Sequence, residues 1–291
     1  MRIENLLHQI DGRNRKKQVK IGRMEKNMGK NTENSVENNI EKKEIDTEIK
    51  SLIIEGRNAV IEAFRAGKPV DKLFVLDGCQ DGPIRTIIRE ARKGDTIINY
   101  VAKERLQQLS ETGNHQGVIA YVAAYEYASI EDMFALAAAR EEDPFFVLLD
   151  DIEDPHNLGA IIRTANLAGA HGVIIPKRRA VGLTATVAKT SAGALNYTPV
   201  AKVTNLVQTM EELKQKGMWF VCADMGGESM YRLNLKGSIG LVIGNEGKGV
   251  GRLVKENCDY VASIPMKGDI DSLNASVAMG VLAYEIVRQR M

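Results

Sequence analysis

Short, uninterrupted apolar runs recur through the second half of the chain, between Phe145 and Met266. The runs are FFVLLD, GVIIP, PVAKV, WFVCADM, GLVIG and YVASIPM. Their length favours strands over buried helices, and their lack of polar alternation predicts strands that are covered on both faces. Segments of helical periodicity lie between them. The sequence therefore predicts an α/β domain with a parallel sheet over residues 144–291.

A smaller α/β unit is predicted ahead of this domain, over residues 51–125. Strands at SLII, KLFVLD, TIINYV and GVIAYVA alternate with helices at NAVIEAFRAG, PIRTIIREARKG and AKERLQQLSETG. Residues 126–143 are rich in Ala and Glu and predict a helical linker that closes at Asp143-Pro144. The small unit holds one histidine, His115, and no nucleophile beside a base. This favours a binding module over a catalytic one.

The first 50 residues have a different composition. Eight Lys and Arg residues lie between Arg13 and Lys30, against a single acid, Glu25. The following stretch, NTENSVENNIEKKEIDTEIK, offers almost nothing to bury, so this extension is predicted to be disordered or loosely helical. It is either a solvated tail or an arm that attracts phosphates.

Composition excludes several classes of protein. The chain has 291 residues, of which 44% are hydrophobic, and a net charge of +1. No apolar run approaches the roughly 18 residues of a membrane span, and the N-terminus lacks the apolar segment of a signal peptide. We therefore expect a cytoplasmic protein with no membrane contact. Cys79, Cys222 and Cys258 form no C-x-x-C pair, so neither a disulfide framework nor a metal site is expected.

The first unusual strand end is LLDDIEDPHNLGAIIRTANLAGAHGVIIP. Asp154 is predicted to cap a helix that has Pro155 at its first position. The apolar stripe of this helix runs through Ile161, and Arg163 points away from it. A guanidinium near a helix start suits a phosphate. The alternatives are a surface arginine and, at Asn157, no more than a cap.

The second is GLVIGNEGKGVG, from Gly240 to Gly251. Because Gly249 follows Lys248, the Walker pattern fails, and the dinucleotide pattern G-x-G-x-x-G is also absent. The glycines would let the backbone approach a flat ligand closely, or would serve only a tight turn. A tight turn does not explain Glu246.

The third is SIPMKGDIDSLNASVAMGVLAYEIVRQRM. Ser272 is predicted to cap the closing helix, which we expect to begin at Leu273, and Asn274 and Ser276 add polar groups there. Apolar residues lie on two flanks of this helix. One flank is therefore predicted to pack on a second surface, such as a partner subunit.

The three segments resemble, in order and spacing, the three motifs of the SpoU (TrmH-like) branch of the SPOUT RNA methyltransferases. In addition, IEGRNAVIEAFRAG and NHQGVIAYV resemble the substrate-binding domain of members that methylate a guanosine ribose in 23S ribosomal RNA. The resemblance covers about residues 53–291. It leaves the extension at residues 1–50 unexplained.

The resemblance implies a fold that ordinary topology rules exclude. It implies a C-terminal SPOUT domain, whose parallel sheet carries a deep trefoil knot, and a small N-terminal L30e-like α/β substrate-binding domain. Because chains rarely thread loops, the residues alone predict a doubly wound sheet without a knot. The resemblance also implies S-adenosylmethionine bound in the knot, a homodimer through the C-terminal domain, ribosomal RNA as partner, and no metal.

Site residues follow from the matched motif positions. The residues implied to hold the cofactor are Gly244, Ile264, Met266 and Leu273. The residues implied to form the reacting cluster are Asn157, Arg163, Glu246, Ser272 and Asn274. The residues expected to contact RNA are Arg57, His115, Gln116 and Lys189. For each of the RNA contacts, a role in stabilising the fold is the alternative.

The group that accepts the proton of the ribose hydroxyl is harder to assign. The resemblance implies Arg163, helped by a substrate phosphate, but a guanidinium almost never loses its proton. We therefore expect Arg163 mainly to orient the phosphate and the ribose. His156, adjacent to the cluster, is an alternative base.

Three other functions are alternatives to an rRNA methyltransferase. A tRNA ribose methyltransferase would share the same motifs, and the separate first domain favours rRNA over it. A catalytically silent RNA-binding protein would look the same outside the cluster. A dinucleotide-dependent enzyme is disfavoured, because the glycine fingerprint for the phosphates is missing.

Overall fold

A computed structural model describes residues 53–269 and 272–291 of the chain. These residues fall within one compact unit, Leu52–Met291. The predicted extension at residues 1–50, with its basic run, lies outside the described residues. No helix within the described ranges is long and apolar enough to cross a bilayer.

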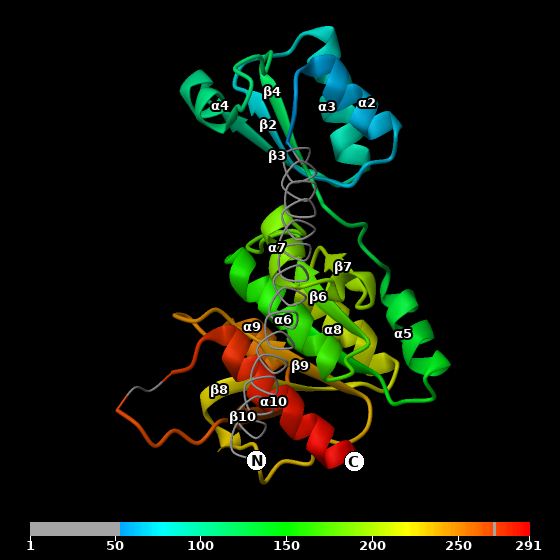
Figure 1. Cartoon of the computed structure of the whole chain (residues 1–291), viewed down its shortest axis with the longest axis vertical. Helices are drawn as coiled ribbons and strands as arrows, with labels where there is room; N and C mark the ends of the chain where they lie inside the picture. The colour runs from blue at the N-terminus through cyan, green and yellow to red at the C-terminus, as the bar shows by residue number, and fades with distance from the viewer. Residues whose placement is uncertain (1–52, 270–271) are drawn as a thin grey trace, which may run out of the picture. The chain divides into compact units, whose positions relative to one another are not determined.

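The first part of the described chain forms a four-stranded sheet (Figure 1). Its strands are β1 (Ile53–Glu55), β2 (Val70–Leu76), β3 (Ile97–Val101) and β4 (Val118–Val122). They lie in the order β1-β4-β2-β3, with β4 antiparallel to both neighbours and β3 parallel to β2. The helices are α2 (Arg57–Arg65), α3 (Gly82–Lys93) and α4 (Lys103–Leu109). The predicted alternation of strands and helices is confirmed here.

Helix α3 shows why these residues fold as they do. Its start is fixed by Asp81, whose side chain accepts a hydrogen bond from Ile84 N at 3.2 Å, and by Pro83 in the first turn. One face buries Ile84 and Ile87 completely in the core of this sheet. The opposite face is polar and exposed, so α3 is an amphipathic cover for the sheet.

The second part contains a six-stranded sheet in which every pairing is parallel, as predicted. Its strands are β5 (Phe145–Leu149), β6 (Gly172–Pro176), β7 (Val200–Val203), β8 (Trp219–Ser229), β9 (Ile239–Ile243) and β10 (Tyr260–Ser263). They lie in the order β10-β8-β9-β5-β6-β7.

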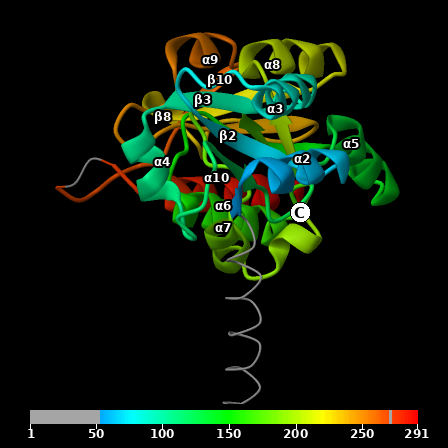
Figure 2. The same cartoon turned by 90° about the horizontal axis from the view of Figure 1, so that it is seen from above.

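Helices cover both faces of this sheet (Figure 2). On one side lie α6 (Pro155–Leu167), α7 (Ala185–Thr190) and α10 (Ala275–Arg290), and on the other α8 (Leu206–Gln215) and α9 (Arg252–Glu256). Successive residues of β5 enter the two cores in turn: Phe145 and Val147 pack with α6 and α10, whereas Phe146 and Leu148 pack with α8. This double burial explains the absence of polar alternation in the strand.

The predicted linker helix is part of the second core. This helix, α5 (Ile130–Ala139), begins with a capping box in which Ser129 and Asp132 exchange hydrogen bonds. Met133 is fully buried in the core that faces α8. Phe134 stacks edge-to-face on Phe146, with ring centroids 5.1 Å apart. Contacts therefore fix α5 to the larger sheet.

The alanine-containing segment TATVAKTSAGAL, between β6 and β7, does not form one continuous helix. It consists of α7 and a separate 3-10 turn, η2 (Ala194–Asn196). Between them Ala192 and Gly193 have φ angles of 50° and 85°, which are left-handed conformations that end an α-helix. Propensity alone missed this break, because Ala is a strong helix former.

Strand order reverses between β5 and β9, which are neighbours in the sheet although β6, β7 and β8 separate them in sequence. In parallel sheets, ligands bind outside the carboxyl ends of the strands at such a point. The chain also returns from edge strand β10 to pack α10 on α6 and β9. The threading of a trefoil knot remains a prediction from the family resemblance.

Candidate active site

Three side chains predicted for the reacting cluster meet at the carboxyl ends of β5 and β9, where the strand order reverses. We call this place the switch point of the sheet. Asn157 follows β5 in the first turn of α6, Glu246 follows β9, and Asn274 precedes α10. Asn157 Nδ2 donates to Glu246 Oε1 at 2.8 Å, and Asn274 Nδ2 donates to Asn157 Oδ1 at 2.9 Å. Asn274 Nδ2 also donates to Glu246 Oε1. One carboxylate therefore joins three segments that lie far apart in the sequence.

The predicted capping of α6 is confirmed, and that of α10 is wrong. Asp154 accepts from His156 N at 2.9 Å, with Pro155 at the first helical position. Helix α10 begins at Ala275 rather than Leu273, and its cap is Asn274, which accepts from Ser276 N at 2.9 Å. Ser272 lies too far upstream to reach the first free N–H groups of this helix.

The glycine-containing loop after β9 is shaped by its own polar groups. Asn245 Oδ1 accepts from Gly247 N at 2.9 Å, and Asn245 Nδ2 donates to the Asp151 carbonyl at 3.1 Å. A Cβ atom on Gly244 would overlap the Gly249 carbonyl group. Close approach of backbone to backbone therefore requires glycine at position 244.

A cavity of about 240 Å³ opens beside this loop. All four residues predicted to hold the cofactor line it, and Glu246 and Ser272 lie on its wall. Other residues on the wall are Ala223, Asp224, Met225, Ile243 and Ala262. The walls are largely apolar and backbone is accessible, which suits a flat heterocycle and an aliphatic chain.

One charged side chain on the cavity wall has a perturbed pKa. Lys255 Nζ lies 2.8 Å from Asp224 Oδ2 and holds the pKa of Asp224 below its ordinary value, helped by a hydrogen bond from Gly226 N. Asp224 therefore stays ionised at neutral pH. It is a second carboxylate at the cavity, beside Glu246.

Arg163 is not part of the hydrogen-bonded cluster. It lies six residues beyond Asn157 on α6, about 9 Å along the helix axis at about 1.5 Å per residue, and its side chain is exposed, as predicted. Within the described ranges it forms no ion pair or hydrogen bond. Leu167 on the same face is 66% exposed, and Val277 and Tyr284 on the adjoining α10 are each 50% exposed.

The candidate RNA contacts in the first domain come together, but their polar groups bind one another. Arg57 N donates to Gln116 Oε1 at 3.2 Å, and Arg57 Nη2 lies 2.7 Å from Asp81 Oδ2. His115 is buried and its Nδ1 accepts from Gly117 N at 3.0 Å. These contacts stabilise the turn before β4. Lys189 lies elsewhere, exposed at the end of α7.

Sequence reasoning missed the two aspartates that follow β5. Asp150 Oδ2 accepts from Gly251 N at 2.7 Å and so closes the far side of the glycine loop. Asp151 supplies the carbonyl that holds Asn245. Their place directly after a buried strand was the signal that could have identified them, because polar residues there lie at the ligand edge of the sheet.

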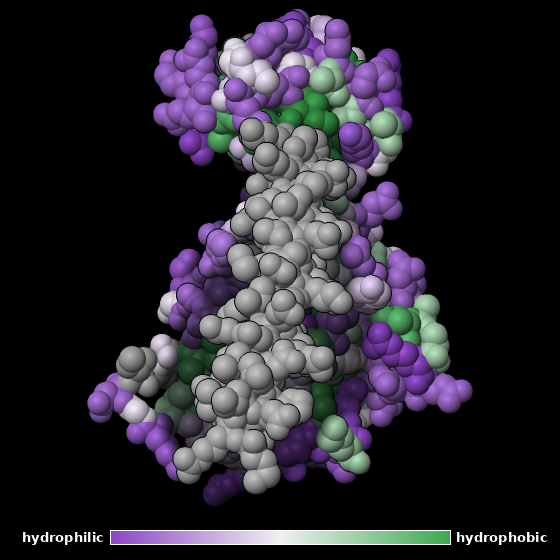
Figure 3. All heavy atoms as spheres, viewed as in Figure 1, coloured by the Kyte–Doolittle hydropathy of each residue, from purple (hydrophilic) through white to green (hydrophobic). Residues whose placement is uncertain are grey.

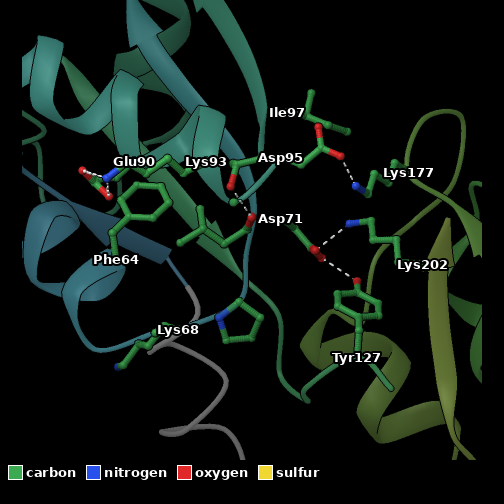
Figure 4. A pocket seen from close by; sticks show the side chains of 15 residues that line it. Phe64, Lys68, Asp71, Glu90, Lys93, Asp95, Ile97, Tyr127, Lys177 and Lys202 are labelled. Carbon is green, nitrogen blue, oxygen red and sulfur yellow. Dashed lines mark hydrogen bonds and ion pairs between the residues drawn. The ribbon is translucent and has the colours of Figure 1, made fainter. Parts of the chain in front are cut away.

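A second cavity, of about 530 Å³, lies between β2, the end of α3, Lys177 directly after β6, and β7 (Figure 4). Asp71 on β2 points at Lys202 on β7, with Oδ1 2.6 Å from Nζ, and accepts from the Tyr127 hydroxyl at 2.9 Å. Asp95 and Lys177 pair at its other end. Burial raises the pKa of Tyr127, so its hydroxyl remains a donor.

Comparisons with known proteins agree with the fold and the motifs. Residues 144–284 match the SpoU rRNA methylase family, and residues 53–128 match a domain described as RNA 2′-O ribose methyltransferase substrate binding. The Bacillus subtilis protein YacO, assigned to the TrmH family of tRNA/rRNA methyltransferases, is 51% identical over 237 residues, which cover 81% of this chain and 94% of YacO. A Staphylococcus aureus protein of the same assignment is 44% identical over 239 residues, 82% of this chain and 96% of that protein.

A solved structure supports the same conclusion. The SpoU methyltransferase AviRb from Streptomyces viridochromogenes, in complex with its cofactor AdoMet, superposes with a TM-score of 0.52. The two are 26% identical, over 81% of this chain and 89% of AviRb. Fold and site thus define an α/β methyltransferase of the SPOUT class with an N-terminal substrate-binding domain. The chain belongs to the SpoU/TrmH family of RNA 2′-O-ribose methyltransferases, as its motifs predicted.

Proposed function

We propose that this enzyme methylates the ribose 2′-hydroxyl of a guanosine in 23S ribosomal RNA. The observation that supports this most directly is the cluster of Asn157, Glu246 and Asn274 on the rim of a largely apolar cavity. The separate substrate-binding domain favours a large structured RNA over tRNA. Relatives are assigned to both kinds of substrate, so a tRNA ribose is the second candidate.

The cavity beside the glycine loop is the proposed site for S-adenosylmethionine. Gly244 would bring its backbone against the ligand, and Ile264, Met266 and Leu273 would provide apolar contacts. The cofactor supplies an electrophilic methyl group on a sulfonium. The chain itself has to hold the ribose oxygen in line with that group, and such positioning accounts for several kcal/mol of barrier reduction, about 7 or more in favourable cases.

The cluster would position the substrate ribose. Glu246 fixes the amides of Asn157 and Asn274, which leaves Ser272 beside them at the cavity wall to bind the acceptor nucleotide. Arg163 would bind the phosphate next to that ribose, because a guanidinium matches two phosphate oxygens at once. The two candidates for accepting the ribose proton are Arg163 and His156, and the dependence of activity on pH distinguishes between them.

The face that carries Arg163 is the proposed dimer surface. Leu167, Val277 and Tyr284 are large, exposed and apolar, and they lie on α6 and α10, which pack together. A second copy covering this face would bury them and place Arg163 in an interface. In that dimer, Arg163 would be placed to contact substrate bound at the cavity of its own subunit or at that of the partner.

The test compares wild-type enzyme with Arg163→Ala. We expect the variant to lose methyl transfer to a 23S rRNA transcript while its affinity for S-adenosylmethionine, measured by calorimetry, stays within about twofold. Loss of both would assign Arg163 a structural role. Mapping of 2′-O-methyl marks on total RNA, with and without the gene, identifies the nucleotide. If deletion of the gene removes marks from tRNA alone, tRNA is the substrate instead of rRNA. If deletion changes no marks, a catalytically silent RNA-binding protein is favoured.

The remaining expectations concern the first domain and the location of the protein. Arg57, His115 and Gln116 would shape the RNA-binding surface through the turn they stabilise. Lys189 would bind the backbone of the RNA as a point charge. Action in the cytoplasm follows from an RNA substrate and remains a prediction.

A further inference from the structure

A groove of about 820 Å³ lies on the first domain, apart from the cavity beside the glycine loop. Its walls are the turn after β2, the outer face of α3 and the edge strand β3, and α3 and β3 lie side by side (Figure 2). The lining residues that carry the argument are Asp77, Arg85, Ile88, Arg89, Arg92 and Tyr100.

The groove is strongly cationic. Arg85, Arg89, Arg92 and Lys93 line it, against a single carboxylate, Asp77, which accepts from Gly78 N in its own turn at 2.9 Å. Hydrophilic residues form most of the outline of this domain in the face that Figure 3 shows. Four cations and one carboxylate give the lining of the groove a net charge of +3, compared with +1 for the whole chain.

Two of the four cations, Arg85 and Arg92, are not neutralised by a carboxylate in the described part of the chain. Glu90 pairs with Arg89 and Lys93, each at 3.1 Å. Arg85 and Arg92 form no ion pair with any carboxylate in the described part of the chain, and both are exposed. Since exposed ion pairs contribute little, even the paired cations can exchange their partner for a phosphate.

The spacing fixes these cations in one row. Positions 85, 89 and 92 are separated by four and three residues, so they lie on one face of α3. The opposite face is anchored by Ile84, Ile87 and Ala91, which are fully buried. Because the helix is also capped by Asp81, the row is held on a rigid element.

An aromatic ring lies on the rim of the same groove. Tyr100 on edge strand β3 is 51% exposed, although a tyrosine gains most by burying its ring. Ile88 contributes an apolar patch on the α3 side. Cations that bind phosphates beside an exposed ring that stacks on bases are the combination that binds unpaired nucleic acid.

We propose that this groove binds an unpaired segment of the substrate RNA, with Arg85 and Arg92 each on a backbone phosphate and Tyr100 stacked on a base. This inference rests on the proposed function and goes beyond it, because it adds a site of substrate recognition on α3 and β3 to the Arg57–Gln116 turn. The groove holds the RNA while the cluster around Glu246 positions the ribose.

The experiment uses the full chain with a 23S rRNA transcript. Arg85→Ala/Arg92→Ala should raise KM about tenfold or more with kcat unchanged at saturating RNA, and should leave S-adenosylmethionine affinity unchanged. The slope of log affinity against log salt should fall by about 1.4 for two lost contacts to single-stranded RNA. The control, Arg65→Ala/Lys236→Ala, removes the same charge from exposed positions outside the groove. It should change neither KM nor the salt slope.

Tyr100 separates stacking from charge. Tyr100→Ala should weaken binding of a single-stranded oligoribonucleotide, whereas Tyr100→Phe should retain it, and neither should affect binding of the same sequence as a duplex. An unchanged KM and salt slope in the Arg85/Arg92 variant would overturn the proposal. A second result would also overturn it: the Arg85/Arg92 variant methylates naked RNA normally but no longer methylates a ribosomal precursor particle. In that case the groove would bind a protein partner rather than RNA.

Direct binding keeps this test independent of catalysis. RNA affinity is measured by filter binding without S-adenosylmethionine, where no transfer can occur and Arg163 is retained. If the wild-type protein methylates no RNA but the Arg85/Arg92 variant still loses RNA affinity, the proposed function fails and the groove proposal stands. If transfer is normal and RNA affinity is unchanged in this variant, the groove proposal fails and the function stands.

Discussion

Glu246 and Asn157, 89 positions apart in the sequence, are joined by a hydrogen bond of 2.8 Å from Asn157 Nδ2 to Glu246 Oε1. Asn157 is almost fully buried, at 8% exposure, so its amide depends on this partner. The same carboxylate oxygen binds Asn274 at the start of α10. The switch point of the sheet is thereby tied to the last helix of the chain.

Removal of this carboxylate should affect both stability and rate. In Glu246→Ala the buried Asn157 amide loses its acceptor, which costs about 1–3 kcal/mol of unfolding free energy. Because the ribose-positioning groups lose their fixed geometry, kcat should fall about 100-fold or more. Glu246→Gln retains one acceptor oxygen and should be intermediate. Glu256→Ala, an exposed partner of Arg252, is the control and should stay within about 0.5 kcal/mol. Wild-type kinetics in Glu246→Ala would refute a positioning role.

Gly244 and Gly247 make a matched pair in the same loop. A Cβ at Gly244 would overlap Gly249, whereas at Gly247 the nearest atom, Asn245 Oδ1, lies 3.6 Å away. Gly244→Ala should therefore distort the loop, at about 1–3 kcal/mol, and abolish measurable S-adenosylmethionine binding in calorimetry. Gly247→Ala should bind normally. Equal binding by both variants would show that the cofactor contacts another part of the chain.

Asp71 and Asp95 allow a buried ion pair to be compared with an exposed one. The side chains of Asp71 and Lys202 are 11% and 14% exposed, whereas that of Asp95 is 65% exposed. Asp71→Ala leaves Lys202 without its carboxylate and should lower the unfolding free energy by about 2–4 kcal/mol. Asp95→Ala should change it by less than about 1 kcal/mol. Denaturant melts of the full chain measure both, and similar losses in the two variants would contradict this ranking.

His171 should make stability depend on pH. It is fully buried, its Nδ1 accepts from Phe145 N at 3.0 Å, and burial holds its pKa below the ordinary 6.5. The unfolded state therefore binds this proton more readily, so stability is full above about pH 6.5 and falls as the pH drops towards the lower folded pKa. The slope approaches about 1.4 kcal/mol per pH unit.

The check is a pH series of denaturant melts on wild type and His171→Gln. Glutamine offers an acceptor but does not titrate, so the variant should show a smaller slope between pH 6.5 and 5. His156→Gln, at an exposed position, should retain the wild-type slope. A wild-type slope in His171→Gln would assign the effect to other groups.

Local pattern predicted the strands and the parallel sheet because burial on both faces leaves a clear signature in the sequence. It also placed Asn157, Glu246 and Asn274 at strand ends, where the structure brings them together. It did not choose correctly between Ser272 and Asn274 as the cap of α10. Both residue types cap well, and Glu246, which is distant in sequence, holds the Asn274 amide in place.

Other features depend on contacts that sequence does not encode locally. Asp71 and Lys202 are 131 positions apart, and nothing near either residue distinguishes this pair from the many other charges of the chain. The spacing of Arg85, Arg89 and Arg92 was visible in the sequence. The position of Tyr100 beside them was not, because it requires the pairing of β3 with β2.

Helix α5 has a consequence for how such chains recombine. Met133 fills the space left by the missing side chain of Gly172, and Phe134 stacks on Phe146, yet the SpoU family match begins only at residue 144. A recombination junction between homologous genes at that point would transfer the six-stranded sheet without α5, the helix that packs on it. Exchange of RNA specificity between relatives should therefore succeed only when the junction falls upstream of Ser129.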